Sequence, residues 1–138
     1  MAFLGLQVEM LLAQVPLLSN LEQGKLTRLA QATKTRQYSD GDSIIVEHDV
    51  GDCMYIVQDG EAVVSVDGVG EVARKRKGDY FGEQALLDDA PRSATIHAAG
   101  PMACLELSRV VFEGFVSAMA RLELLLAQVG HYFGGSFT

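Results

Sequence analysis

Short apolar runs separated by glycine-containing turns fill the middle of the chain, from residue 35 to about residue 108. A glycine in a tight turn adopts positive φ at little steric cost, so each turn can end one run and start the next. Runs of this length and spacing are typical of the strands of an all-β barrel or sandwich. The runs cover residues 44–46, 54–57, 62–66 and 71–73, and two further segments, 93–98 and 103–107, follow them.

Two helices are predicted before this β-rich region. Apolar residues recur with helical spacing over residues 3–15 until Pro16 interrupts the pattern. Ser19 or Asn20 can cap a second helix over about residues 21–32. The apolar face of the first helix either packs on its own domain or forms a docking surface for a neighbouring domain.

A third helix is predicted after the β-rich region, with Ser108 as its cap. Its apolar positions include Phe112, Phe115 and Met119, and we expect it to bend near Gly114 or Ser117 and to continue to residue 128. The glycine-containing tail over residues 129–138 is expected to fray.

The composition indicates one globular domain and argues against nucleic-acid binding. A chain of 138 residues with 49% hydrophobic residues can bury a core. Its net charge of −7 disfavours binding to a polyanion, which requires many lysines and arginines. The single basic run, residues 74–77, is expected to be a solvated strand end.

No residues form a recognisable metal site or catalytic group. Cys53 and Cys104 lie far apart in apolar contexts, so we expect two buried, reduced thiols. His48, His97 and His131 are scattered, and no Ser-His-Asp or Cys-His arrangement can be assembled. We therefore predict no metal and no enzyme activity.

The chain also lacks the patterns of membrane insertion and secretion. No apolar run reaches the roughly 18 to 20 residues that span a bilayer. The first residues lack the basic region and cleavage site of a signal peptide. A cytoplasmic protein is the expectation.

Residues 81–96, FGEQALLDDAPRSATI, combine an acid, a permanent cation and several small residues. Arg92 offers a planar fork of donors suited to phosphate oxygens, and Glu83 can accept hydrogen bonds from a sugar hydroxyl. Small residues allow main-chain amides to approach an anion. The combination predicts a pocket for a nucleotide monophosphate. The alternatives are a surface pair between Arg92 and Asp88 or Asp89, and a Glu83 that only favours the first turn of a short helix.

This stretch resembles the phosphate-binding cassette of cyclic nucleotide-binding domains, as found in regulatory subunits of cAMP-dependent kinase, in cGMP-dependent kinases and in cyclic-nucleotide-gated channels. The family pattern F-G-E-x-A-L, followed by P-R-x-A-T, matches without a gap, and the resemblance extends from about Leu12 to about Leu126. It implies a mainly β fold, an eight-stranded β-roll flanked by N-terminal and C-terminal helices. The implied single domain, 1–138, has helices in 1–33, the roll in 34–108 with the cassette in 81–95, and helices and a tail in 109–138.

The resemblance assigns roles to individual residues. Glu83 would hold the ribose 2′-hydroxyl and Arg92 the cyclic phosphate, with amides near Gly82 completing the phosphate nest. Val64 and Val66 would wall the base, although core packing is the alternative for both. The implied ligand-binding residues are Gly82, Glu83, Gln84, Ala85, Arg92, Ser93, Ala94, Val64 and Val66.

Three positions leave alternatives open. The Ser93 hydroxyl can reach a purine edge, but it does not decide between cAMP and cGMP. Gln84 replaces the more usual leucine and either contacts the base or a moving helix, or is simply half-exposed. Tyr132 or Phe133 either covers the base or belongs to the tail.

The resemblance implies a regulatory domain that binds cAMP or cGMP. Binding would rearrange the C-terminal helix and so control an attached or separate kinase catalytic domain or another effector. One alternative is a β-roll that no longer responds to nucleotide and serves as a docking module. A second is a cupin-type enzyme, which would need a histidine-rich metal set that the sparse histidines do not supply.

Overall fold

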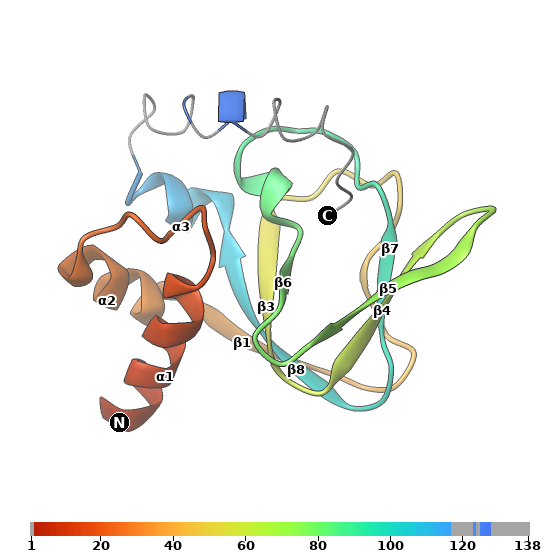
Figure 1. Cartoon of the computed structure of the whole chain (residues 1–138), viewed down its shortest axis with the longest axis horizontal. Coiled ribbons are helices and arrows are strands. Elements are labelled where there is room, and N and C mark those ends of the chain that lie inside the picture. The colour runs from red at the N-terminus through yellow and green to blue at the C-terminus, as the bar shows by residue number, and fades with distance from the viewer. Residues whose placement is uncertain (1, 117–122, 124, 128–138) are drawn as a thin grey trace.

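The computed structural model describes residues 2–116, 123 and 125–127 and places two helices ahead of a β-roll (Figure 1). In chain order the elements are α1 (Ala2–Ala13), α2 (Gln23–Ala32), β1 (Lys34–Tyr38), β2 (Ser43–Ile45), β3 (Cys53–Asp59), β4 (Glu61–Val66), β5 (Gly70–Arg76), β6 (Tyr80–Phe81), the 3-10 helix η1 (Glu83–Leu86), β7 (Thr95–Ala98), β8 (Met102–Ser108) and α3 (Arg109–Glu113).

The strands form two four-stranded antiparallel sheets. One sheet has the order β1-β8-β3-β6 and the other the order β2-β7-β4-β5. The eight strands in the described part of the chain, with helices on either side of them in sequence, confirm the predicted mainly β roll. The hairpin of β4 and β5 projects on the side opposite to α1 and α2 (Figure 1).

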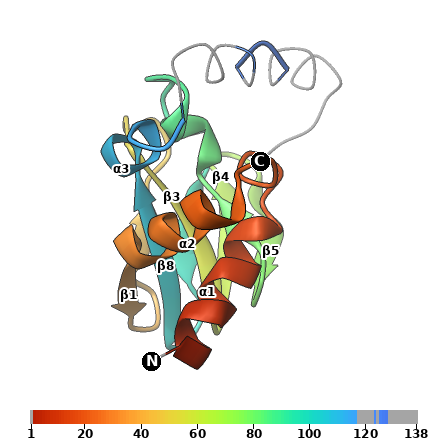
Figure 2. The same cartoon turned by 90° about the vertical axis from the view of Figure 1, so that its left-hand side faces the viewer.

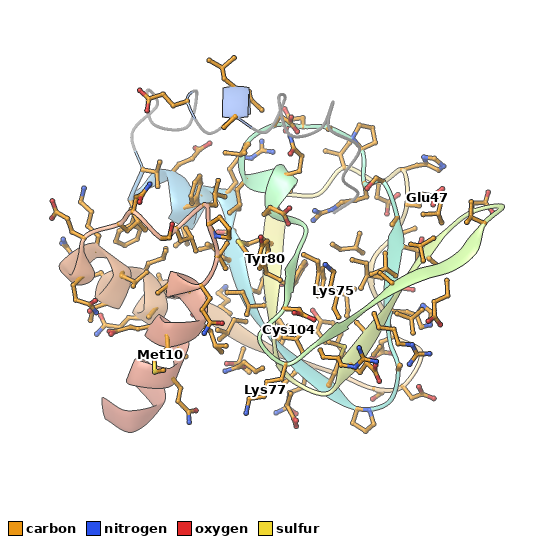
Figure 3. The ribbon with its side chains drawn as sticks, in the orientation of Figure 1. Met10, Glu47, Lys75, Lys77, Tyr80 and Cys104 are labelled. Carbon is orange, nitrogen blue, oxygen red and sulfur yellow. The ribbon has the colours of Figure 1, made fainter. Side chains whose placement is uncertain are left out.

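Strands β3 and β8 are buried on both faces because they separate two apolar clusters. Met54 and Ile56 of β3 pack with the helices, whereas Tyr55 and Val57, which alternate with them, point into the roll. Cys104 of β8 is 0% exposed in the roll interior (Figure 3). The sheet β1-β8-β3-β6 therefore packs against the helices with one face and lines the interior of the roll with the other.

Helices α1 and α2 cover the outer face of this sheet (Figure 2). Leu12 at the end of α1 and Leu29 of α2 are fully buried in the cluster that also contains Leu105 and Leu107 of β8. The apolar residue at the C-terminal end of α1 is therefore explained by packing on its own domain. Met10 remains 58% exposed.

The predicted cap of the second helix is wrong. The helix begins at Gln23 after Glu22, which makes no side-chain cap. Ser19 instead donates its hydroxyl hydrogen bond back to the Pro16 carbonyl, and the chain from residue 14 to residue 21 forms consecutive short-range backbone turns. These turns delay the start of the helix beyond Asn20.

The predicted cap of the third helix is confirmed. The Ser108 Oγ accepts a hydrogen bond from the Val111 N–H at 3.3 Å. Helix α3 ends at Glu113, and Gly114 follows as its C-terminal cap. The predicted bend near Ser117, the apolar position Met119 and the tail lie outside the described residues.

The basic run at residues 74–77 lies at the end of β5 and in the turn after it, and most of it is exposed, as predicted. Arg74 forms ion pairs with Glu61 and Glu71, and Arg76 pairs with Glu61. Lys77 is exposed at the lower rim of the roll (Figure 3). Two of the four cations are therefore neutralised locally.

None of the helices in the described ranges is both long enough and apolar enough to cross a membrane. Within the same residues, no three His, Cys, Asp or Glu side chains gather in a way that could hold a metal ion.

Candidate functional site

The cassette, residues 81–95, runs from β6 through η1 and a loop to the start of β7. Gly82 precedes η1 with φ of 78°, a left-handed conformation that glycine adopts without steric cost. A Cβ at this position would also lie 2.9 Å from Nη1 of Arg92 and 3.2 Å from the Cys53 carbonyl oxygen. Position 82 therefore requires glycine for its backbone conformation and for the close approach of Arg92.

Arg92 is half-buried, and main-chain groups form hydrogen bonds with both its guanidinium and its backbone. Its Nη1 donates to the Gly82 carbonyl at 3.1 Å, and its Nη2 donates to the Cys53 carbonyl at 2.8 Å. The Arg92 N–H donates to the Asp49 carbonyl at 2.7 Å, and its own carbonyl accepts from the His48 N–H at 2.8 Å. The side chain thus has a defined position between the cassette and the loop before β3.

A surface ion pair between Arg92 and Asp88 or Asp89, the alternative to phosphate binding, is wrong. Asp88 accepts a hydrogen bond from the Gln84 amide at 2.6 Å, and Asp89 pairs with Arg109 at 2.6 Å. Among residues 2–116, no carboxylate lies within ion-pair distance of Arg92. Arg92 is therefore available to an outside anion.

The electrostatic surroundings of Arg92 favour such an anion. Burial lowers the pKa of this guanidinium, and the neighbouring groups Tyr55, Cys53, Asp52 and Glu83 raise it to a smaller extent. An arginine starts so far above neutrality that it stays charged despite this burial. Because its hydrogen-bond acceptors are two neutral carbonyls, the charge is not compensated at close range. A phosphate at this point would gain charge-assisted hydrogen bonds.

Two hollows open beside the loop between β2 and β3. The first has a volume of about 190 Å³ and is lined by residues 44–46, residues 49–53, Tyr55 and Arg92. The second has a volume of about 520 Å³ and is lined by residues 47–48, 65–68, Gly70 and Thr95. Arg92 forms part of the wall of the first hollow, together with Asp49 and Asp52, and does not line the second.

Glu83, the first residue of η1, is only 6% exposed. Its Oε2 atom is buried and has no hydrogen-bond partner among the residues that the structure describes. A buried carboxylate oxygen without a donor is costly for the protein, and it is an acceptor that a hydroxyl group can satisfy. The same carboxylate acts on the charge of Arg92. The carbonyl that Nη1 of Arg92 contacts belongs to Gly82, the residue before Glu83, so the predicted cation lies against the backbone next to the predicted acid.

The other predicted site residues divide between the cassette and the roll. Ala85 is buried in η1, Gln84 and Ala94 are half-buried, and Ser93 is exposed. Val64 is 9% exposed in the roll interior, and Val66 lines the second hollow and not the hollow beside Arg92. Tyr132 and Phe133 lie outside the described residues.

Arg109 is a residue of this region that the sequence reasoning missed. From the first turn of α3, its Nε donates to the Ala85 carbonyl at 2.8 Å, and Nη1 bonds to Asp89 at 2.6 Å. Its Nη2 donates to the Asp88 carbonyl, and its N–H donates to the Asp52 carbonyl at 2.7 Å. A cation in the first turn of a helix opposes the helix dipole, and this unfavourable placement was the available signal.

Comparisons with known proteins agree with this geometry. The sequence profile described as the cyclic nucleotide-binding domain matches residues 35–119. The cAMP-dependent protein kinase regulatory subunit of Blastocladiella emersonii is 42% identical over 116 residues, which cover 81% of this chain and 29% of that protein. This relative is a regulatory subunit and not a catalytic chain, in agreement with the prediction of a protein that is not an enzyme.

Solved structures show the same fold. The regulatory domain of Toxoplasma gondii PKA with cAMP superposes with a TM-score of 0.77 at 35% identity and covers 86% of this chain and 46% of that one. The cAMP-bound PfPKA-R has a TM-score of 0.75 at 33% identity, with 96% of this chain and 46% of that one covered. The chain thus spans less than half the length of these relatives.

The cassette pattern, the roll and the profile match over residues 35–119 lead to one assignment. This chain belongs to the cyclic nucleotide-binding domain family.

Proposed function

We propose that this chain binds cAMP in the hollow beside Arg92 and is a regulatory module of a cAMP-dependent protein kinase. One observation carries the proposal. Among the described residues, the half-buried Arg92 guanidinium has no carboxylate partner, and the Glu83 residue that follows its contact Gly82 has a buried carboxylate oxygen without a donor. One ligand that has both an anionic group and a hydroxyl group would satisfy the two side chains together, and a cyclic nucleotide is such a ligand.

Each part of the ligand has a separate partner in this proposal. The cyclic phosphate accepts hydrogen bonds from Arg92 and from amides of the cassette near Gly82 and Ala85. The ribose 2′-hydroxyl donates to Glu83. The base extends toward Ser93 and Val66, which lie at the exposed end of the cassette and in the second hollow. One neutral hydrogen bond contributes only about 0.5–1.5 kcal/mol, so we expect Ser93 alone to give modest selectivity for the base.

The cassette is also placed to report binding to the C-terminal helix. Leu86 of η1 and Phe112 of α3 are fully buried in one apolar cluster, and Arg109 joins α3 to the Ala85 carbonyl. A movement of η1 toward the phosphate therefore changes the surface on which α3 packs. The ligand shifts this equilibrium only by its difference in affinity between the two arrangements. We propose a kinase catalytic subunit as the effector, and the similarity to regulatory subunits of cAMP-dependent protein kinase supports this choice.

Isothermal titration calorimetry with cAMP and with cGMP tests the binding. We expect heat from cAMP with wild type and a loss of affinity by orders of magnitude in Arg92→Ala, because several charge-assisted hydrogen bonds of about 1.5–3 kcal/mol disappear. Arg36→Ala is the matched control, since Arg36 is an arginine on β1 with an exposed ion pair to Glu106. We expect it to bind cAMP as wild type does.

Two results would contradict the proposal. Absence of heat with both nucleotides would favour a docking module that has lost the nucleotide response. Unchanged cAMP affinity in Arg92→Ala would place the phosphate elsewhere.

A further inference from the structure

Arg92 has a glycine on each side of its guanidinium. A Cβ built on Gly51 would overlap Nη2 of Arg92 and would lie 2.7 Å from its Nε and 2.8 Å from its Cζ. A Cβ built on Gly82 would lie 2.9 Å from Nη1. Distances below about 3 Å do not occur for real Cβ atoms, so any side chain at position 51 would occupy the space of the guanidinium.

The backbone does not require glycine at position 51. Gly82 has φ of 78°, and Gly51 is absent from the residues with positive φ. An L-residue could therefore adopt the Gly51 conformation without strain. The three heavy atoms nearest to this Cβ all belong to Arg92, so the arginine is the nearest steric obstacle to a side chain at this position.

The loop that carries Gly51 is anchored on both sides. The Asp49 carbonyl accepts from the Arg92 N–H at 2.7 Å, and the Asp52 carbonyl accepts from the Arg109 N–H at 2.7 Å. A side chain at position 51 would therefore meet an anchored loop on one side and the end of a long arginine side chain on the other. The arginine end is the part that can move, because it has several rotatable bonds.

We propose that Gly51 is a positioning residue for nucleotide binding. Its missing side chain lets the Arg92 guanidinium lie against the loop, with its donors at the Gly82 and Cys53 carbonyls and in the wall of the hollow. The inference rests on the proposed role of Arg92 in phosphate binding, and it adds a residue outside the cassette to that site.

The test combines Gly51→Ala with Arg92→Ala in a double-mutant cycle, with cAMP affinity and Tm measured for all four proteins. We expect Gly51→Ala to weaken cAMP binding by about tenfold to a hundredfold, the equivalent of one charge-assisted contact. In the Arg92→Ala background the same change should leave the residual affinity unaltered. A structural role of Gly51 unrelated to Arg92 would instead reduce affinity or Tm equally in both backgrounds.

The Tm values give a second, ligand-free readout. Replacing glycine by alanine at a compatible backbone position restricts the unfolded chain and stabilises the fold. We expect this gain in the Arg92→Ala background and its reduction or reversal when Arg92 is present. Gly24→Ala is the matched control, because a Cβ there meets nothing within 4 Å and its φ is not positive. It should raise Tm and leave cAMP affinity unchanged.

The outcomes separate this inference from the proposed function. If wild type binds cAMP, Arg92→Ala does not, and Gly51→Ala binds as tightly as wild type, only the role of Gly51 is overturned. If wild type does not bind cAMP, the proposed function is wrong. If the Tm changes of Gly51→Ala and Arg92→Ala are additive in the double variant, the steric coupling between the two residues is wrong as well. If Gly51→Ala does not fold, the double variant must recover the fold, and its failure to do so overturns the inference.

Discussion

Arg92 and Glu83 are both withdrawn from solvent, and neither has an ion-pair partner in the described part of the chain. Arg92 rests on neutral carbonyls, and Glu83 leaves one buried oxygen without a donor. Such groups cost stability in the ligand-free protein. A ligand that supplies the missing partners would remove this cost. The residues that form the binding site therefore also lower the stability of the ligand-free protein.

Glu83→Gln should therefore stabilise the ligand-free protein and weaken its ligand binding. The amide has the same shape without the buried charge, so we expect the free energy of unfolding to rise by about 1 kcal/mol. The hydrogen bond from a ribose hydroxyl would lose its charged acceptor, which should lower cAMP affinity by about tenfold or more. Urea unfolding without nucleotide and calorimetry with cAMP measure the two effects.

Glu71→Gln is the control for this substitution, because Glu71 is a glutamate on the exposed face of β5 that pairs with Arg74. We expect it to change neither property appreciably. A Glu83→Gln protein that loses stability and retains full affinity would show that this carboxylate has a structural role.

At the scale of elements, Arg109 connects α3 to the end of η1. Arg109→Ala would leave the Ala85 and Asp88 carbonyls without their donor, and we expect a loss of about 1–3 kcal/mol in the free energy of unfolding. Asp89→Ala removes only the carboxylate side of the contact, which is 80% exposed, and should cost less than about 1 kcal/mol. Urea unfolding of both variants makes the comparison.

The order of these two losses is the decisive result. Equal losses in Arg109→Ala and Asp89→Ala would mean that the exposed ion pair, and not the main-chain contacts, joins the two elements. A smaller loss in Arg109→Ala than in Asp89→Ala would rule out Arg109 as the connection.

Site residues that lie close together in the sequence could be predicted, whereas those that reach the site from a distant segment could not. Gly82, Glu83 and Arg92 lie within one short stretch, and their spacing predicts an acid near a cation. Gly51 looked like one more turn glycine, because its contact with Arg92 exists only once the loop before β3 packs on the cassette.

The wrong cap prediction for α2 also reflects contacts that the local sequence rule does not include. The predicted Ser108 cap is confirmed, because its hydroxyl oxygen accepts a hydrogen bond from the Val111 N–H within the same helix. Ser19 satisfied the same local rule, but its hydroxyl bonds to the Pro16 carbonyl in a preceding turn. A side-chain cap can be recognised from the sequence only where nearby backbone groups do not compete for it.

At the scale of the whole molecule, the sheet shared by the helices and the roll also buries several weak acids. Burial raises the pKa of Cys53, Cys104 and Tyr38 to about 12 in each case, and it raises the pKa of Tyr55 as well. Neither thiol is in a disulfide. In the unfolded chain these groups titrate near pH 8.5 to 10. The folded protein therefore keeps protons in alkaline solution that the unfolded chain releases.

We predict a loss of stability at alkaline pH on this basis. A pKa that is raised in the folded state contributes stability that is complete below the unfolded pKa, here about 9, and that is lost as pH rises toward about 12. Each proton by which the two states differ lowers the free energy of unfolding by about 1.4 kcal/mol per pH unit. Tm measured from pH 8 to pH 11 should fall by several degrees or more, with no comparable fall between pH 7 and pH 8.

Cys53→Ser identifies one group behind this fall. Serine does not ionise in this range, and its hydroxyl can keep the hydrogen bond that the Cys53 thiol makes to Asp52 at 3.4 Å. The variant should therefore lose less Tm between pH 9 and pH 11 than wild type does, whatever its Tm at pH 8. An equally steep fall in the variant would remove Cys53 from the explanation, and a flat wild-type profile would mean that the buried acids of this sheet do not couple folding to pH.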